Sequence, residues 1–305
     1  MSRDTIRLPH DAYRLLQTLR AAGHSAYVVG GCVRDSLLGR LPGDWDICTS
    51  ARPDEMKALF CSQRLILTGE KHGTVAVILH GKPYEMTTYR LDGSYRDHRH
   101  PDNVQFVDDL AADLARRDFT INALALCLNK ERYGELVDPF GGLEDMDELT
   151  IRTPLDPDVT FSDDPLRMMR AVRFATQLGF FIDPDTFDAI IRNRERISII
   201  SKERIVDELN KIVLSPKPSI GFDLLDKCGL LPLIFPELCA LKGVETKEGI
   251  GHKDNFAHTL MVLDRLSKTS DNLWLRWSAL FHDIAKPATK RFDPRLGWTC
   301  LLYTS

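Results

Sequence analysis

The sequence lacks several patterns that would assign it to a compartment. It has seven cysteines, an odd number, but neither a CxxC pair nor a zinc-ligand spacing. No apolar run approaches the roughly 20 residues that a helix needs to span a bilayer. The N-terminus, MSRDTIRLPHDAYRLL, lacks the basic-then-apolar pattern of a signal peptide. We therefore predict reduced, mostly buried thiols, no membrane partner and a cytoplasmic location.

An excess of basic charge is also missing. The net charge of −4 is not typical of a nucleic-acid-binding protein. Phosphate contacts depend on local groups of Arg and Lys, however, and the chain has two such groups. The first is Arg167, Arg170 and Arg173, and the second is Arg192, Arg194, Arg196, Lys202 and Arg204. An RNA substrate is therefore compatible with this charge.

Neither an internal repeat nor a low-complexity tract occurs, and 305 residues suffice for two or more packed units. A helix is predicted over about 9–22, closed by Gly23, and a strand–turn–helix unit over about 26–40. Further strands are predicted for DWDIC, RLILTG, TVAVILH and PYEMTTYR. These strands follow one another too closely for helical crossovers, which predicts a mixed, mostly antiparallel sheet.

From about residue 111 the pattern becomes helical. Helices are predicted for LAADLARRDFTINALALCL, PLRMMRAVRFATQLG, PDTFDAIIRNRERISII and KERIVDELNKIVLS, and they continue beyond residue 217. The expected architecture is a small α/β head over 1–145, a helical neck over 146–215 and a helical body over 216–305. Because GWTCLLYTS ends without a capping helix, we expect the sequence to be cut within its last domain.

The motif DWD contains the first candidate site. Residues i and i+2 of a strand share a face, so a strand would place the carboxylates of Asp44 and Asp46 together. Two such charges favour a cation between them, and Mg²⁺ prefers carboxylates plus phosphate oxygens. Taken alone, the motif is better explained by two solvent-facing acids on an edge strand.

The preceding segment VVGGCVRD favours a nucleotide site. Its glycines allow close approach of a phosphate, and a helix begins there with free N–H groups. Arg34 in its first turn is suited to pairing with phosphate oxygens, whereas Asp35 is interpreted as a structural first-turn acid. Glu85 in YEMTTYR is the candidate third acid for a two-metal site, with a plain surface acid as the alternative.

A resemblance now becomes apparent. The ordered motifs VVGGCVRD, DWD, YEMTTYR, RRDFTINALA, DPFGG, DPLRMMRAVRFATQLGF and ERIVDEL resemble the bacterial (class II) tRNA nucleotidyltransferase and poly(A) polymerase family over roughly residues 26–214. The resemblance implies a nucleotidyltransferase head, with Asp44 and Asp46 as metal ligands and Glu85 as their supporting carboxylate. The nucleotide-binding residues that it implies are Gly31, Arg34, Arg116, Arg117 and Asp118. Asp118 would contact the ribose 2′-OH, and Asn122 would support that loop.

The stretch DPLRMMRAVRF suggests how bases are selected. Asp164 and Arg167 are three residues apart, which on a helix places them on one face. A carboxylate accepts and a guanidinium donates, so the pair matches the amino group and ring nitrogen of both cytosine and adenine. Arg170 and Arg173 match further triphosphate or RNA contacts in the family. Asp163 departs from the family, which usually has Glu there. The apolar residues Met168, Met169, Val172 and Phe174 are predicted to be helix core.

Two other segments resemble known elements. RLDGSYRDHRHPDNVQF resembles the family's loop that helps to switch from C to A addition, and it favours CCA addition over poly(A) synthesis. HKDNFAHTL and LFHDIAKP resemble the start of an HD domain, a metal-dependent phosphohydrolase fold. There His258, His282 and Asp283 would bind a second metal ion, and the alternative is a helical scaffold without hydrolysis.

The functional hypothesis is addition of CCA to tRNA from CTP and ATP with two Mg²⁺ ions, without a template. The RNA 3′-OH would attack and pyrophosphate would leave. An A-adding enzyme or poly(A) polymerase is the alternative within the class. An HD-type phosphohydrolase with an RNA-binding head is the alternative of another class. The expected partners are tRNA or another RNA 3′ end, and no protein partner is implied.

Overall fold

The computed structural model describes residues 6–92, 104–127, 134–243, 246–247, 250–251, 254–293 and 297–300. The chain forms two compact units, Met1–Asp164 and Pro165–Ser305. Within the described ranges, no helix has both the length and the apolar character needed to cross a membrane. The domain boundaries near residues 145 and 215 remain predictions.

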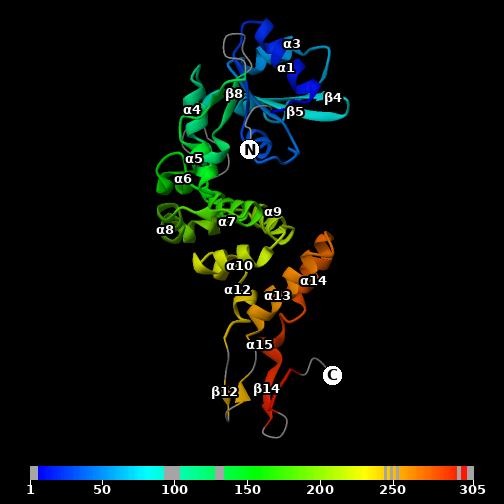
Figure 1. The fold of residues 1–305 in the computed structure, drawn as a ribbon, viewed down its shortest axis with the longest axis vertical. Coiled ribbons are helices and arrows are strands. Elements are labelled where there is room, and N and C mark those ends of the chain that lie inside the picture. The colour runs from blue at the N-terminus through cyan, green and yellow to red at the C-terminus, as the bar shows by residue number, and fades with distance from the viewer. Residues whose placement is uncertain are drawn as a thin grey trace. The chain divides into compact units, whose positions relative to one another are not determined.

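The first unit contains a seven-stranded sheet with the order β3–β4–β5–β2–β1–β8–β9 (Figure 1). The strands are β1 (Ala26–Val29), β2 (Asp46–Thr49), β3 (Arg64–Ile66), β4 (Thr74–Leu79), β5 (Lys82–Thr88), β8 (Ala125–Cys127) and β9 (Leu136–Val137). Within this sheet β2 and β5 run parallel, with Ile47 opposite Met86, and the other neighbours run antiparallel. The predicted mixed, mostly antiparallel sheet is confirmed.

Helices and short connections complete this unit. The α-helices are α1 (His10–Ala21), α2 (Gly31–Leu37), α3 (Pro53–Leu59), α4 (Leu110–Ala115), α5 (Gly142–Asp147) and α6 (Pro157–Asp163). The remaining elements are the 3₁₀ turns η1 (Glu70–His72) and η2 (Thr120–Asn122) and the strands β6 (Arg90–Asp92), β7 (Val104–Phe106) and β10 (Thr150–Ile151). α1 forms as predicted because Leu15, Leu16 and Leu19 recur at helical spacing and are buried.

The central strands are buried on both faces, which explains their nearly continuous apolar sequence. All four residues of β1 are buried, as are the last three of β2. Residues of β1, β2, β8 and α4 form one hydrophobic cluster together with their neighbours in sequence. Its buried members are Tyr27, Val29, Cys48, Tyr89, Leu114, Ala123, Ala125 and Cys127. This core fixes the ends of β1, β2 and β8, where the candidate site lies.

The helix predicted to run from residue 111 through ALALC is wrong in its second half. α4 ends at Ala115, and Ala125–Cys127 forms β8, which pairs with β1 on one side and β9 on the other. A short apolar run has no periodicity that distinguishes a buried strand from a buried helix. Here the sheet decides, because Leu126 pairs with Val28 and completes its buried centre.

The second unit is mainly helical. Its α-helices are α7 (Leu166–Leu178), α8 (Pro184–Asn193), α9 (Lys202–Val213), α10 (Pro218–Lys227), α11 (Leu231–Ile234), α12 (Pro236–Cys239), α13 (Asn255–Ser267), α14 (Leu273–Phe281) and α15 (Lys286–Thr289). Its other elements are η3 (Arg194–Ile199), β11 (Phe181–Ile182) and the hairpins β12–β13 (Thr246–Lys247, Ile250–Gly251) and β14–β15 (Lys290–Asp293, Gly297–Cys300). The predicted fold class, an α/β head followed by a helical body, is confirmed.

α7, the first helix of the second unit, packs against α9 and α10. Its predicted core residues Met168, Met169, Val172 and Phe174 are buried, which confirms that prediction. The approach of α10 depends on Gly221. A Cβ atom there would lie 2.5 Å from Ile212 Cγ2 and 2.8 Å from Thr176 Oγ1. The three helices therefore pack so closely that this position has no room for a side chain.

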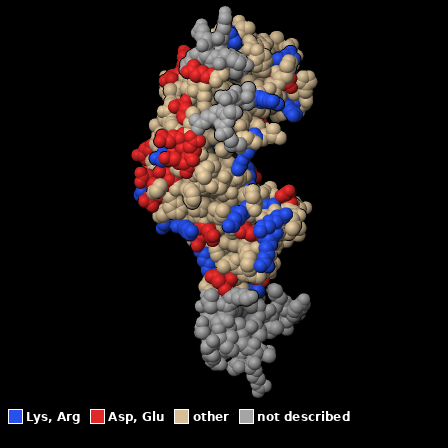
Figure 2. All heavy atoms as spheres, in the orientation of Figure 1, with Lys and Arg blue, Asp and Glu red and all other residues tan. Residues whose placement is uncertain are grey.

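Surface charge is unevenly distributed over the first unit. Figure 2 shows acidic side chains gathered over the region of α5 and α6 on the face drawn. Glu144, Asp147 and Glu148 are exposed there. A negative surface repels phosphate groups, so we do not expect this face of α5 and α6 to contact RNA.

Candidate functional site

The turn between β1 and α2 forms one wall of the candidate site. Gly30 has φ +81°, a left-handed conformation that favours glycine, and its N–H donates to the carbonyl oxygen of Leu124 on the way into β8. A Cβ atom at Gly30 would lie 2.9 Å from Arg117 Nη1. Two features therefore favour glycine at position 30: the positive φ angle and the lack of space beside the guanidinium group of Arg117.

Two of the predicted acids, Asp46 and Glu85, lie on the neighbouring strands β2 and β5. Asp46 is the first residue of β2, and Glu85 is the residue before Met86, the partner of Ile47 in the parallel pair. Asp44 is exposed and precedes β2, so the prediction that a strand holds both Asp44 and Asp46 is wrong for Asp44. Pro42 and Gly43 precede it, and such residues favour a turn over a strand.

The three carboxylates interact electrostatically despite that difference. Burial is the main cause that raises the pKa of Asp46 to about 6, and the charges of Asp44 and Glu85 raise it further. The charge of Arg117 opposes this shift. Carboxylates offer only oxygen donors, which suit Mg²⁺ or Mn²⁺, so the charges of Asp44 and Glu85 acting on Asp46 are compatible with a cation beside it.

Arg116 and Arg117 are anchored by an acid in α4. Arg116 donates to Asp113 Oδ1 through Nε at 3.0 Å and Nη2 at 2.7 Å, and Arg117 Nη2 lies 3.4 Å from Asp113 Oδ2. Asp113 is fully buried. The sequence analysis missed this residue, although its spacing of three and four residues before the arginines is the spacing of helical ion pairs.

A second network joins Asp118 to Arg34 through Asn122. Arg34 Nη1 donates to Asn122 Oδ1 at 2.5 Å, and Asn122 Nδ2 donates to Asp118 Oδ1 at 3.0 Å. Asp118 also accepts the N–H of Phe119 at 2.9 Å. Arg34 pairs in addition with Asp35 at 2.7 Å. Asn122 therefore connects the side chains that were predicted to contact phosphate and ribose.

α5 supports this network from behind. Asp138 Oδ1 and Oδ2 accept the N–H groups of Gly142 and Leu143 at 2.8 and 2.9 Å, which caps the start of the helix. Asp145, which is buried, accepts from Thr120 Oγ1 at 2.6 Å and from Arg152 Nε at 3.0 Å. The DPFGG motif thus holds η2 in place, and Asp145 is a second supporting acid that the sequence analysis missed.

The predicted base-selecting residues fall on either side of the division between the units. Asp164 is not on α7: it follows α6 with φ −135° and ψ 99°, and α7 begins at Leu166. The prediction of one helical face is therefore wrong. Pro165 explains the difference, because a residue before proline disfavours the helical conformation. Their joint reading of a base remains a prediction.

Two other arginines of α7 have described environments. Arg173 lies 2.7 Å from Oε2 of the buried Glu208 and 4.1 Å from the ring centroid of Phe174. Arg170 lies 5.5 Å from the same centroid. Arg173 is thus fixed within the second unit by an ion pair and an aromatic face. His98 and His100, in the loop predicted to switch nucleotide choice, lie outside the described residues.

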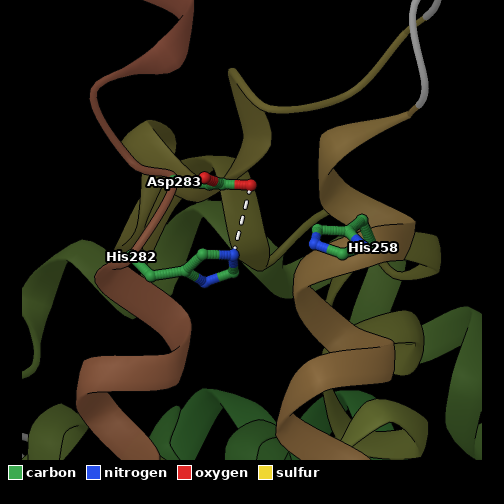
Figure 3. A group of neighbouring side chains, drawn as sticks. All are labelled: His258, His282 and Asp283. Atoms are coloured by element: carbon green, nitrogen blue, oxygen red, sulfur yellow. Dashed lines mark ion pairs between the residues drawn. The ribbon is translucent and has the colours of Figure 1, made fainter. Parts of the chain in front are cut away.

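A separate cluster occupies the second unit. Figure 3 shows His258 of α13 facing His282 at the end of α14, with Asp283 beside them. One donor atom of each side chain lies within 4.8 Å of those of the other two. His282 Nδ1 is 2.7 Å from the carbonyl oxygen of Ala279, so it must donate, and Nε2 lies 3.2 Å from Asp283 Oδ2. The same oxygen of Asp283 accepts from Lys286 Nζ at 2.7 Å, so this carboxylate has a cationic partner in the structure.

Comparison with known proteins identifies the family of the chain. Residues 26–152 match the family model of the poly(A) polymerase head domain, and residues 179–242 match that of a probable RNA- and SrmB-binding site of polymerase A. The CCA-adding enzyme of Geobacillus thermodenitrificans is 48% identical over 219 residues, 72% of this chain and 53% of that protein. The CCA-adding enzyme of Bacillus velezensis is 39% identical over 276 residues, 87% of this chain and 67% of that protein.

Solved structures give the same result. The crystal structure of the Bacillus stearothermophilus CCA-adding enzyme in complex with CTP matches with a TM-score of 0.71 and 37% identity, covering 92% of this chain and 65% of that one. A tRNA nucleotidyltransferase complexed with a primer tRNA and an incoming ATP analogue matches with a TM-score of 0.64 and 27% identity, covering 88% of this chain and 75% of that one. The chain spans about half the length of several curated relatives that it matches. The chain belongs to the family of nucleotidyltransferases that carry the poly(A) polymerase head domain and include the bacterial CCA-adding enzymes.

Proposed function

We propose that this chain catalyses template-independent addition of C, C and A to the 3′ end of tRNA, with CTP and ATP as substrates. The observation that carries the proposal is the position of Asp46, which begins a strand parallel to that of Glu85 and is acted on by the charges of Asp44, Glu85 and Arg117. Relatives crystallised with CTP, with an ATP analogue and with tRNA support this choice of substrates. Reduced thiols and tRNA as substrate agree with a cytoplasmic location.

The reaction joins the RNA 3′-oxygen to the α-phosphorus of the nucleotide, while the bond to the β-phosphate breaks and pyrophosphate leaves. Two Mg²⁺ ions bound by Asp44 and Asp46, with Glu85 in support, would neutralise the triphosphate and increase the nucleophilicity of the hydroxyl group. The guanidinium groups of Arg34 and Arg117 bind phosphate oxygens. This chemistry requires positioning and charge, because the protein forms no covalent intermediate.

Recognition of the nucleotide is divided between sugar and base. Asp118, held by Asn122 and the N–H of Phe119, accepts a hydrogen bond from the ribose 2′-OH. Asp164 and Arg167 offer an acceptor and donors that match cytosine and adenine, whereas guanine and uracil present the reverse pattern. Arg116, Arg170 and Arg173 add positive charge for triphosphate or RNA, and the backbone at Gly31 allows close approach of phosphate.

One assay tests this proposal. A tRNA transcript that lacks its 3′ CCA is incubated with Mg²⁺ and labelled CTP and ATP, supplied separately and together. Ordered incorporation of C, C and A is the expected result. Incorporation of A alone on any RNA would instead identify an A-adding enzyme or poly(A) polymerase. The double variant Asp44→Ala, Asp46→Ala should abolish addition, and retention of activity by it would overturn the metal site.

A second function is favoured by the cluster of His258, His282 and Asp283. We propose that it binds a divalent transition metal ion, because two imidazoles and a carboxylate form the nitrogen–oxygen donor set that such ions prefer. Calorimetric titration with Zn²⁺, Ni²⁺ and Mn²⁺ tests binding, and His258→Ala should abolish it. Hydrolysis of 2′,3′-cyclic nucleotides to nucleoside monophosphates would extend the proposal to an HD-type hydrolase, whereas absence of any metal binding would refute it.

A further inference from the structure

The buried acid Asp113 has an unusual environment for a residue of helix α4. Its side chain is 0% exposed, and the pKa shifts of Cys48 and Tyr89 include its charge among their causes. Isolated buried carboxylates are costly, so such a group requires compensating partners. Asp113 has two, Arg116 and Arg117.

Those two partners are held unequally. Arg116 makes two hydrogen bonds to Oδ1, at 3.0 and 2.7 Å, whereas Arg117 makes one contact of 3.4 Å to Oδ2. One carboxylate neutralises only one of two guanidinium charges. The pair therefore keeps a net positive charge, and Arg117 is the partner that is bound more weakly.

Arg117 is directed toward the candidate catalytic site. Its Nη1 atom lies where a side chain at Gly30 would begin, and its charge is close enough to lower the pKa of Asp46. Its Nε atom is buried and has no hydrogen-bond partner among the described residues. A buried N–H group without a partner is uncommon and costly, which points to a bound anion as its acceptor.

Asp113 and Asp46 thus compete for the same guanidinium group. With Asp113 in place, Arg117 is drawn toward α4 and remains beside Gly30. Without that charge, the nearest strong acceptors would be the carboxylates of the site, and Arg117 would pair with Asp46 directly. Such a pair would occupy the carboxylate that a metal ion needs and would remove the donor that a phosphate needs.

We propose that Asp113 is a positioning residue for nucleotide binding: it holds Arg117 beside Gly30, directed at the triphosphate and away from Asp46. The proposal rests on the proposed function, in that the anion is the phosphate of a nucleotide. It assigns a role to a residue that touches neither nucleotide nor metal and acts only through Arg117.

The test is a double-mutant cycle of Asp113→Asn and Arg117→Ala, with calorimetric CTP binding and the KM values for CTP, ATP and tRNA as readouts. Asp113→Asn should weaken CTP binding and raise the nucleotide KM values about tenfold, while the KM for tRNA stays within about twofold. Adding it to Arg117→Ala should change these values less than about twofold, because the two residues act as a unit. Asp113→Glu should recover part of the loss.

Two outcomes would overturn the proposal: additive effects in the cycle, or equal losses for tRNA and nucleotides. Asp264→Asn is the matched control for loss of a semi-buried carboxylate, since Asp264 accepts from the N–H and hydroxyl of Ser219 in the second unit. It should lower thermal stability without changing nucleotide KM.

A spectroscopic readout separates this proposal from the proposed function. The NMR resonance of the Arg117 Nε–H group, assigned with Arg117→Lys, should be sharp in the full chain and should move or broaden in Asp113→Asn. If it does so while the chain adds no nucleotides, the positioning role stands and the proposed function fails. If the resonance is unchanged, the positioning role is wrong whatever the activity.

Discussion

Asp46 illustrates at the residue scale how a candidate metal ligand destabilises the protein that holds it. Its carboxyl group is largely buried next to Asp44 and Glu85, and its pKa rises from 3.8 to about 6. The folded protein therefore binds this proton more tightly than the unfolded chain does. As the pH rises from about 4 to about 6, the ionisation of Asp46 lowers the free energy of unfolding.

Asp46→Asn should accordingly stabilise the metal-free protein. A difference of about two pKa units corresponds to at most about 3 kcal/mol, so we expect a gain of about 1–3 kcal/mol at pH 7.5. The gain should vanish near pH 4, where Asp46 is protonated in both states. Denaturant unfolding in EDTA measures it, and a gain independent of pH would contradict the explanation. Nucleotide addition should be abolished, and Mg²⁺ should stabilise the original chain more than the variant.

Gly30 offers a second test at this scale. Gly30→Ala introduces a Cβ atom 2.9 Å from Arg117 Nη1 at a position with φ +81°. Gly23→Ala is the matched control, because Gly23 has φ +89° and no described atom lies within 4 Å of its Cβ position. Both should lose about 1 kcal/mol of stability from the backbone. Gly30→Ala alone should also raise the KM for CTP about tenfold, and equal KM values for both variants would show that the contact with Arg117 is unimportant.

The individual site residues were predictable to different degrees. Asp46 begins β2 and Glu85 lies on the neighbouring strand β5, as predicted, although the parallel pairing of these strands was not predicted. Asp44 was assigned to the strand wrongly, since alternation alone does not define where a strand begins. Asp113 escaped prediction although its spacing to Arg116 and Arg117 is that of helical ion pairs, whereas the contact of Asp145 with Thr120 depends on packing and not on a local motif.

At the scale of elements, the contact between α5 and η2 decides whether the nucleotide-binding loop keeps its shape. A Cβ atom on Gly142 would lie 2.3 Å from the carbonyl oxygen of Thr120. A backbone atom cannot move aside as a flexible side chain can. The loop or the helix must therefore shift to accommodate any side chain at this position.

Gly142→Ala should thus destabilise the protein by about 2–3 kcal/mol and impair nucleotide binding through Asp118 and Asn122. Gly43→Ala is its control, because it lacks a positive φ and no described atom lies within 4 Å of its Cβ position. Thermal unfolding together with calorimetric CTP binding distinguishes the two variants. Similar stability for both would mean that the space at Gly142 adjusts easily.

The elements with strong periodicity were predicted correctly, as were the short strands TVAVILH and PYEMTTYR, whereas the short apolar run ALALC was not. α1 and α7 have amphipathic patterns of a dozen residues, which fix their type. ALALC was assigned to a helix but forms β8, because its partners β1 and β9 lie about 100 residues before and about 10 residues after it in sequence. Such pairing depends on tertiary structure and cannot be read from a local window.

At the scale of the whole molecule, the sequence correctly indicated an α/β part followed by a helical part. It also indicated a negative net charge, but not its concentration over α5 and α6 (Figure 2). The sequence also did not predict that a buried arginine, Arg276, would connect the helices of the second unit. Arg276 of α14 is 1% exposed and is among the largest fully buried side chains described.

Arg276 connects three helices of the second unit through backbone carbonyls. Its Nη1 atom donates to the carbonyl oxygens of Val213 and Ser215 at the end of α9, both at 2.9 Å. Its Nη2 atom donates to Ser267 O at the end of α13 and to Asp271 Oδ1, and Nε donates to Ser270 O. These groups satisfy the carbonyls that helix ends leave without intrahelical partners.

Arg276→Lys should therefore destabilise the second unit strongly, although it preserves the charge. A lysine offers three donors from a single atom and cannot reach carbonyls spread around a planar guanidinium group. The buried ammonium and the unsatisfied carbonyls should together cost about 3 kcal/mol or more. Hydrogen exchange should become faster for the backbone amides of α9, α13 and α14, and the thermal transition of the second unit should occur at lower temperature.

Arg265→Lys, at an exposed position of α13, should change stability by less than about 0.5 kcal/mol. Equal exchange rates in the two variants would show that the helix ends are held by packing alone and that Arg276 only fills space between them.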